Sequence, residues 1–158
     1  MKIGVLSDTH SLLLPKALFN AFASVDLIIH AGDICDEAVL KELKALAPVR
    51  AVQGNMDCPG LKKKLPLRDI INAQDIVIGV CHGHVGASDA LSNAKNIFAQ
   101  DKVDAVIYGH SHQALNERID GILYFNPGSP NDVVKAKFFS YGVLTVTGKT
   151  VKGEIIKC

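Results

Sequence analysis

Short aliphatic runs alternate with amphipathic stretches along the first third of the chain. Runs of strand length occur at residues 2–6, 27–30 and 49–53. Between them, residues 15–23 and 36–46 carry apolar side chains at helical spacing, with Pro15 suited to a first helical turn and Asp36 to an N-cap. Leu12–Leu14, just before the first of these helices, are expected to pack as its lead-in rather than to form an exposed patch. Strands that alternate with helices favour a parallel sheet.

The rest of the chain is richer in short β-type segments. Residues 69–71 and 75–81 are expected to pair as strands around a turn at 72–74, followed by a helix at 88–100 and a buried strand at 104–108. The clearest later strands are 123–126, 138–146 and 151–157. These later strands are expected to be antiparallel, most simply in a second sheet packed against the first. We therefore predict an α/β fold of two mixed sheets packed as a sandwich and flanked by helices.

Composition and charge narrow the class of protein. The 158 residues suit a single domain over 1–158, and 48% hydrophobic with 21% charged residues is typical of a globular protein. The formal net charge is +1 and long basic tracts are absent from the sequence, so we expect no nucleic-acid partner. The first apolar run is too short for a signal peptide or a membrane span, which favours a cytoplasmic protein without a membrane partner.

Two smaller features admit more than one interpretation. Lys62–Lys64 are expected to lie in a solvated loop, with a patch that attracts phosphate as the alternative. The four cysteines lack the CxxC spacing and are expected to be reduced. Three of them lie near candidate metal ligands, where they are expected to fill space, with metal ligation or oxidation as the alternative.

Side chains that bind metals follow the ends of five expected strands. The segments are Asp8-Thr9-His10, Gly32-Asp33, Gly54-Asn55, Cys81-His82-Gly83-His84 and Gly109-His110-Ser111-His112. Ligands of open α/β sheets bind at the carboxyl ends of the strands, so these segments are expected to converge. Carboxylate, imidazole and amide oxygen together suit a site for two cations.

The spacing within these segments suggests how each one reaches the site. In Asp8-x-His10 and His110-x-His112, an extended backbone would direct both side chains to the same side. The glycines at 32, 54 and 109 precede ligands, where they would allow a sharp turn and a close approach of the backbone.

In this order the motifs resemble those of the calcineurin-like metallophosphoesterases, and the short spacings with Asn126-Pro127-Gly128-Ser129 are most similar to compact YfcE-type phosphodiesterases. The resemblance implies the metallophosphoesterase fold and two divalent cations that share Asp33. One cation would be held by Asp8, His10, Asp33 and His112, and the other by Asp33, Asn55, His82 and His110. Mn²⁺ is expected first, with Ni²⁺, Fe²⁺ or Zn²⁺ as alternatives.

The resemblance also implies a reaction. A hydroxide bridging the two metals would attack a phosphodiester, with Asn55, Asp33 and His82 as the catalytic residues. The Asn55 amide could in addition donate a hydrogen bond to a phosphate oxygen. The expected substrate is a small phosphodiester, and a homo-oligomer is possible.

One position departs from the family pattern. Met56 stands where many members have a histidine that protonates the leaving group, and a thioether cannot donate a proton. Asp36, which would partner that histidine, is interpreted as a helix cap with catalysis as the alternative. His84 and Asp57 are expected near the site, in contact with the substrate or behind the ligands. The missing acid favours a phosphodiesterase over a general phosphatase.

Two alternative functions remain. The retromer phosphoesterase-like subunit, which binds partner proteins, resembles this fold, so an interaction scaffold is one alternative. All seven matched ligand positions are filled here, which favours a working metal centre. A phosphomonoesterase is the second alternative.

Overall fold

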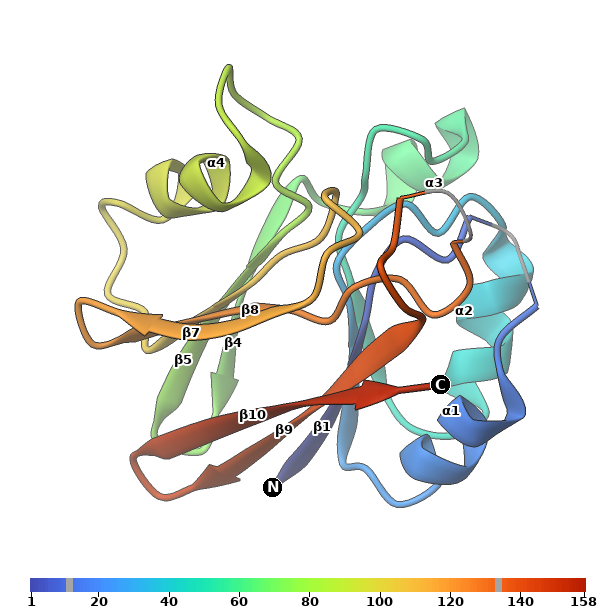
Figure 1. The fold of residues 1–158 in the computed structure, drawn as a ribbon, viewed down its shortest axis with the longest axis horizontal. Helices are drawn as coiled ribbons and strands as arrows, with labels where there is room; N and C mark the ends of the chain where they lie inside the picture. Colours follow the sequence, from blue (N-terminus) through green and yellow to red (C-terminus); the bar gives the residue numbers. More distant parts are fainter. Residues whose placement is uncertain (11–12, 133–134) are drawn as a thin grey trace.

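Two mixed five-stranded sheets pack face to face in this computed structural model, which describes residues 1–10, 13–132 and 135–158 (Figure 1). The first sheet has the order β10-β9-β1-β2-β3, and the second has the order β4-β5-β6-β8-β7. The core between them joins aliphatic residues of both sheets, such as Ile3 and Ile29 of the first and Ile78 and Ile107 of the second. The alternation of apolar residues along the strands places these side chains on the inner faces.

The first sheet combines early and late strands of the chain. Its members are β1 (Lys2–Leu6), β2 (Leu27–His30), β3 (Val49–Ala51), β9 (Ser140–Thr147) and β10 (Thr150–Lys157). Strands β1, β2 and β3 are parallel, whereas β9 runs antiparallel to both β1 and β10.

The second sheet is mixed in the same way. Its members are β4 (Arg68–Ala73), β5 (Ile76–Cys81), β6 (Ala105–Ile107), β7 (Leu115–Ile119) and β8 (Ile122–Asn126). Strands β5, β6 and β8 are parallel, and β4 and β7 are antiparallel edges. The expectation that the late strands would form the second sheet holds for β7 and β8 but was wrong for β9 and β10, which extend the first sheet. The expected antiparallel pairing was also wrong for β8 with β6, because these two strands are parallel.

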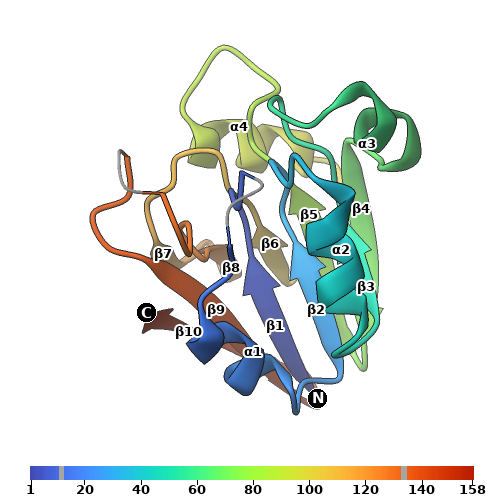
Figure 2. The ribbon, with the colours of Figure 1, turned by 90° about the vertical axis from the view of Figure 1, so that its right-hand side faces the viewer.

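Helices cover the outer faces of the sandwich (Figure 2). They are α1 (Lys16–Phe22), α2 (Glu37–Lys44), α3 (Pro59–Lys64) and α4 (Ala90–Ile97). Leu18 and Phe22 of α1 and Leu43 of α2 pack with Ile28 on the first sheet. Ala94 of α4 packs on the second sheet. No helix in the described part of the chain is long and apolar enough to cross a membrane.

Two local expectations need correction. Lys62–Lys64 form the last turn of α3 rather than a loop, although their side chains are exposed as expected. The lead-in to α1 is only partly packed, because Leu14 is buried whereas Leu13 is 91% exposed. Leu12 lies outside the described residues.

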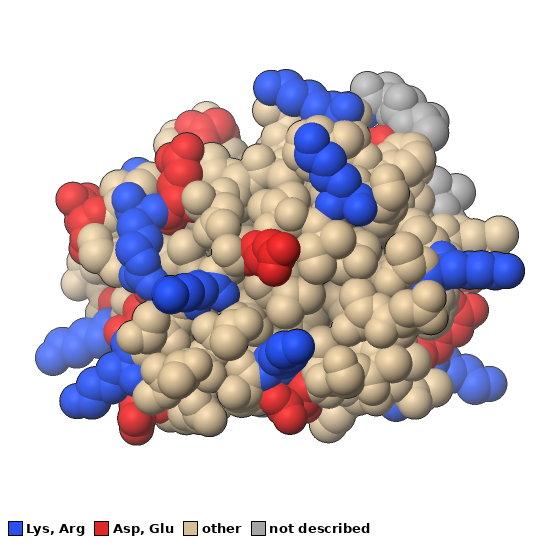
Figure 3. Space-filling model, turned by 60° about the horizontal axis from the view of Figure 1, so that its bottom comes forward, with Lys and Arg blue, Asp and Glu red and all other residues tan. Residues whose placement is uncertain are grey.

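Charges of both signs are interspersed on the face of the molecule shown in Figure 3. Lysine and arginine side chains alternate there with aspartate and glutamate rather than forming one continuous patch. This distribution agrees with the small net charge of the sequence.

Candidate metal centre

The candidate ligands gather at one edge of the sandwich, where β1, β2 and β5 point toward the top of Figure 2. The loops that follow β1, β2, β3, β5 and β6 carry the segments identified in the sequence. Two groups of side chains in these loops each have ligand atoms within 4.8 Å of one another. They are Asp8 with His10 and His112, and Asp33 with His82 and His110.

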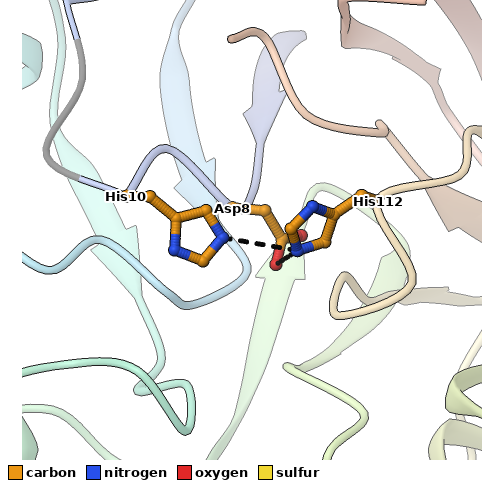
Figure 4. A group of neighbouring side chains, drawn as sticks. All are labelled: Asp8, His10 and His112. Atoms are coloured by element: carbon orange, nitrogen blue, oxygen red, sulfur yellow. Dashed lines mark hydrogen bonds and ion pairs between the residues drawn. The ribbon is translucent and has the colours of Figure 1, made fainter. Parts of the chain in front are cut away.

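The first cluster joins the loop after β1 to the loop after β6 (Figure 4). His112 Nε2 lies 3.2 Å from Asp8 Oδ1 and 3.3 Å from His10 Nε2. Two ring nitrogens facing one another at this distance repel unless a proton or a cation lies between them. The Asp8 carboxylate is fully buried, so the cluster concentrates negative charge where water cannot screen it.

The second cluster joins the loops after β2, β5 and β6. His82 Nε2 lies 3.2 Å from Asp33 Oδ2 and 3.8 Å from Asp8 Oδ1. His82 Nδ1 donates a hydrogen bond to the Ala31 carbonyl at 2.7 Å, which leaves Nε2 with a lone pair directed at the cluster. Since Asp8 Oδ1 approaches His82 as well as His112, the two clusters are neighbours.

Two buried atoms in these clusters lack a hydrogen-bond partner among the described residues. They are Asp8 Oδ1 and His82 Nε2, and both belong to completely buried side chains. Leaving such atoms unpaired is costly, whereas a cation bound in each cluster would satisfy them. Their carboxylate and imidazole chemistry suits divalent cations of the Mn²⁺, Fe²⁺ and Zn²⁺ type. The residues present therefore fit two candidate metal sites.

The backbone at all four ligands of the Asp-x-His and His-x-His pairs is left-handed rather than extended, as it also is at Asp33. The φ angles are 56° at Asp8, 48° at His10, 67° at His110 and 57° at His112. The interpretation that extended backbone aligns each Asp-x-His or His-x-His pair was therefore wrong. Backbone hydrogen bonds hold the first pair in this conformation, from Asp8 N–H to Gly32 O at 3.0 Å and from His10 N–H to Asp33 O at 3.1 Å. Such conformations cost roughly 1–3 kcal/mol each and cluster at functional sites.

Two glycines allow the backbone to pass directly against ligand carboxylates. A Cβ atom on Gly54 would lie 2.1 Å from Asp33 Oδ1, and one on Gly109 would lie 2.7 Å from Asp8 Oδ2. Real side chains do not tolerate such contacts, so only glycine fits at either position. The close approach expected from the sequence is confirmed for these two glycines.

Asn55 and Met56 lie at the mouth of the site. Both are exposed and line a hollow of about 330 Å³ together with five site residues and a lysine. The other lining residues are His10, Asp33, His110, His112, Asp132 and Lys135. The Met56 N–H donates to Asp33 Oδ1 at 2.7 Å, and its side chain is 60% exposed. An apolar thioether thus faces the space beside the candidate metal sites.

Asp57 ties two ligand loops together. Its carboxylate is 3% exposed and accepts hydrogen bonds from the N–H groups of Ile34, Cys35 and Gly54, each at 2.7 Å. The expectation that it lies behind the ligands fits this position. It fixes the loop that carries Asp33 relative to the loop that carries Asn55.

We expect Asp57→Ala to lower the free energy of unfolding by about 3 kcal/mol, because three buried N–H groups would lose a charged acceptor. Urea unfolding followed by circular dichroism measures this change. The matched control is Glu37→Ala, which removes an exposed ion pair with Lys64 and should cost less than about 1 kcal/mol. Equal losses in the two variants would show that Asp57 does not hold the loops.

Asp36 and His30 take structural positions. The Asp36 side chain accepts a hydrogen bond from Ala38 N–H at 2.9 Å and caps α2, which agrees with the interpretation as a cap. His30 is fully buried between Thr9 Oγ1 and Gly32 N–H. Burial lowers the pKa of His30 to about 3, so the ring is neutral at physiological pH.

His84 lies beside the second cluster. Its ring centroid is 5.3 Å from that of His82 and 6.3 Å from that of His110, and its Nδ1 is a buried atom without a hydrogen-bond partner among the described residues. Burial, together with the charges of those two histidines, lowers the pKa of His84. A role for His84 toward the substrate stays a prediction.

Carboxylates and histidines of the centre shift one another's pKa values. Burial alone would raise the pKa of Asp33, but the close approach and charge of His82, together with the Met56 N–H, outweigh it and lower that pKa to about 2. Burial alone would lower the pKa values of His82 and His112, whereas the neighbouring aspartates raise both. Without a cation, protons therefore compensate the carboxylates, and cations must compete with them.

The cysteines near the ligands are free thiols. Cys35 Sγ lies 3.7 Å from His10 Nδ1 and donates toward the Met56 carbonyl at 3.5 Å. Burial raises the pKa of the Cys35 thiol to about 12, with the charges of Asp57 and Asp33 adding to the effect. A protonated thiol is a poor metal ligand, which agrees with the interpretation that it fills space.

The sequence interpretation missed the segment 129–132. Ser129 Oγ donates to the Asp8 carbonyl at 2.8 Å, Asn131 Nδ2 donates to the Thr9 carbonyl at 3.0 Å, and Asp132 accepts a hydrogen bond from His112 Nδ1. The resemblance identified the motif at 126–129 but gave it no role. His112 and Asp132 are 20 positions apart in the sequence, so local spacing could not predict their contact.

Comparisons of the sequence with known proteins agree with this geometry. A family model described as the calcineurin-like phosphoesterase superfamily domain matches residues 1–149. The probable metallophosphoesterase MJ0623 of Methanocaldococcus jannaschii is 45% identical over 136 residues, which cover 82% of this chain and 68% of that protein. Phosphodiesterase MJ0936 of the same organism is 34% identical over 144 residues, covering 81% of this chain and 83% of that protein.

Solved structures show the same architecture. One, described as a novel archaeal phosphodiesterase, is 28% identical with a TM-score of 0.81, covering 99% of this chain and 100% of that chain. Vps29 of Chaetomium thermophilum has a TM-score of 0.82 at 18% identity, covering 99% and 97% of the two chains, and shows the fold alone. The helix-flanked sandwich predicted from the sequence is confirmed by these likenesses.

Proposed function

This chain belongs to the calcineurin-like phosphoesterase superfamily, and from that premise we propose that it is a phosphodiesterase that uses two divalent cations. The observation that carries the proposal is the pair of neighbouring Asp/His clusters, with members of both lining one hollow of about 330 Å³. In a structural metal site protein ligands fill every coordination position, whereas a catalytic site keeps one position open for water or substrate. Mn²⁺ is the cation we propose first.

Two cations bound in these clusters would activate water, hold phosphate oxygens and neutralise the charge that develops during displacement. Asp33 supplies a carboxylate between the loops of β2 and β3, and we propose that both cations share it. The Ala31 carbonyl orients His82 so that its Nε2 faces the centre. Asn55 lies exposed at the mouth, where its amide can supply an oxygen to a cation and donate an N–H to a phosphate oxygen.

Met56 supports the preference for diesters. A monoester presents three charged or protonated oxygens, whereas a diester carries a second organic substituent that needs an uncharged surface. The exposed thioether of Met56 offers such a surface and cannot donate a proton to a leaving group. The relative at 34% identity that is named a phosphodiesterase adds support.

The proposal predicts that purified protein hydrolyses bis-p-nitrophenyl phosphate faster than p-nitrophenyl phosphate in the presence of Mn²⁺. Chelation followed by gel filtration should remove the activity, because the clusters alone provide no nucleophile, and added Mn²⁺ should restore it. Release of p-nitrophenolate measures both rates. Turnover unaffected by chelation would refute the metal-dependent reaction, and faster monoester turnover would refute only the diester preference.

A further inference from the structure

A second carboxylate lies behind one histidine of the first cluster. His112 Nδ1 is hydrogen-bonded to Asp132 Oδ2, while Nε2 of the same ring faces Asp8 and His10. A carboxylate oxygen accepts, so Nδ1 carries the proton and the Nε2 lone pair is directed into the cluster. Asp132 therefore fixes both the tautomer and the orientation of the His112 ring.

Asp132 is itself held in place by its own segment. Its backbone N–H donates to Ser129 Oγ at 3.1 Å, and that hydroxyl donates to the Asp8 carbonyl at 2.8 Å. The Lys135 N–H donates to Asp132 Oδ2 at 3.2 Å, and the Asp132 side chain is only 12% exposed. The carboxylate behind His112 and the backbone of Asp8 are thus parts of one hydrogen-bonded unit.

The second cluster is supported differently. His82 donates its Nδ1 hydrogen to the backbone carbonyl of Ala31, a neutral acceptor, at 2.7 Å. A carboxylate acceptor increases the basicity of a ligating imidazole more than a carbonyl does. Substitution of such outer partners changes metal affinity by about 10- to 100-fold. His112 of the first cluster and His82 of the second therefore differ in the group that accepts the Nδ1 hydrogen.

We propose that Asp132 is a positioning residue that sets the metal affinity of the cluster of Asp8, His10 and His112, and so makes the two cation positions unequal. The inference rests on the metal binding that the proposed function requires. Asp132 is not among the residues that the family motifs identify, because it lies after the last of those motifs, residues 126–129. It predicts that loss of the Asp132 carboxylate weakens one binding step and leaves the other unchanged.

Calorimetric titration of the metal-free full chain with Mn²⁺ tests the inference without any measurement of turnover. His10→Ala and His110→Ala identify which binding step belongs to which cluster. Asp132→Asn should weaken the step that His10→Ala removes by about 10- to 100-fold and leave the step that His110→Ala removes unchanged. Asp132→Ser, which also lacks the carboxylate, should shift the same step and serves if the asparagine variant does not fold.

Asp120→Asn is the matched control, because Asp120 lies exposed in the turn between β7 and β8 and asparagine tolerates its φ of 51°. It should bind both equivalents of Mn²⁺ as the unmodified protein does. Unchanged titrations for both Asp132 variants would overturn the inference, and so would equal weakening of both steps. A natural chain that binds no Mn²⁺ would instead overturn the proposed function, so the two failures are distinguishable.

Discussion

Asp33→Asn should reduce hydrolysis of bis-p-nitrophenyl phosphate by about 10³-fold, because several kcal/mol of charge stabilisation depend on the carboxylate that we propose is shared by the cations. The substitution keeps the shape of the side chain and retains an acceptor for the Met56 N–H, which now bonds Oδ1 at 2.7 Å. It removes the charge that lies 3.2 Å from His82 Nε2. The rate with saturating Mn²⁺ measures the loss.

Asp36→Asn is the matched control for this substitution. It makes the same chemical change three positions away, and asparagine caps a helix as well as aspartate does. Because the Asp36 side chain bonds the Ala38 N–H at the start of α2, turnover should stay within about twofold of the natural protein. Retained turnover in Asp33→Asn would refute the proposal that both cations share Asp33. A large loss of turnover in Asp36→Asn would favour a catalytic role for Asp36 over a role as a helix cap.

The elements that hydrophobic periodicity could predict are those with a buried face. Strands β1 and β2 occupy the predicted residues 2–6 and 27–30 because their side chains are almost all buried and read as continuous apolar runs. Helix α3 was not predicted, because it is six residues long and buries only Leu61, which gives no helical pattern of apolar residues. The sheet to which β9 and β10 belong was not predicted either, because the apolar pattern of a strand does not indicate which sheet it joins.

The candidate site was predictable as far as its residues follow strands. Residues at the carboxyl ends of the parallel strands β1 and β2 must meet at one edge of the first sheet, so the convergence of Asp8 and Asp33 followed from their places in the sequence. His82 follows β5 of the second sheet, and the packing of the two sheets brings it to the same edge. The left-handed backbone of His10 and His112 did not follow, and at His10 a tertiary hydrogen bond from its N–H to the Asp33 carbonyl accompanies it.

Sequence spacing predicts little about the residues that support the ligands. Asp57 was expected behind the ligands, but its three N–H partners come from two different loops. Asp132 carries no periodic or motif signal, and only the fold places it against His112. Long-range hydrogen bonds of this kind depend on the complete topology rather than on any local pattern.

Met56→His should raise hydrolysis of phenyl phosphate, a monoester with a basic leaving group, by about 10²-fold, the lower end of what a general acid contributes. The exposed position of Met56 leaves room for an imidazole, and its backbone bond to Asp33 does not depend on the side chain. The lower end is expected because Asp36 is engaged at the cap of α2 rather than available to orient the new ring.

Dependence on the leaving group separates proton donation from a general change at the mouth of the site. p-Nitrophenolate needs little protonation, so p-nitrophenyl phosphate should gain much less than phenyl phosphate in the same variant. The gain should fall as pH rises above the imidazole pKa of about 6.5, because only the protonated ring donates. Met56→Gln, a neutral residue of similar length, is the matched control and should give neither effect. An equal gain for both monoesters, or the same gain in Met56→Gln, would show that polarity rather than the missing acid limits monoester hydrolysis.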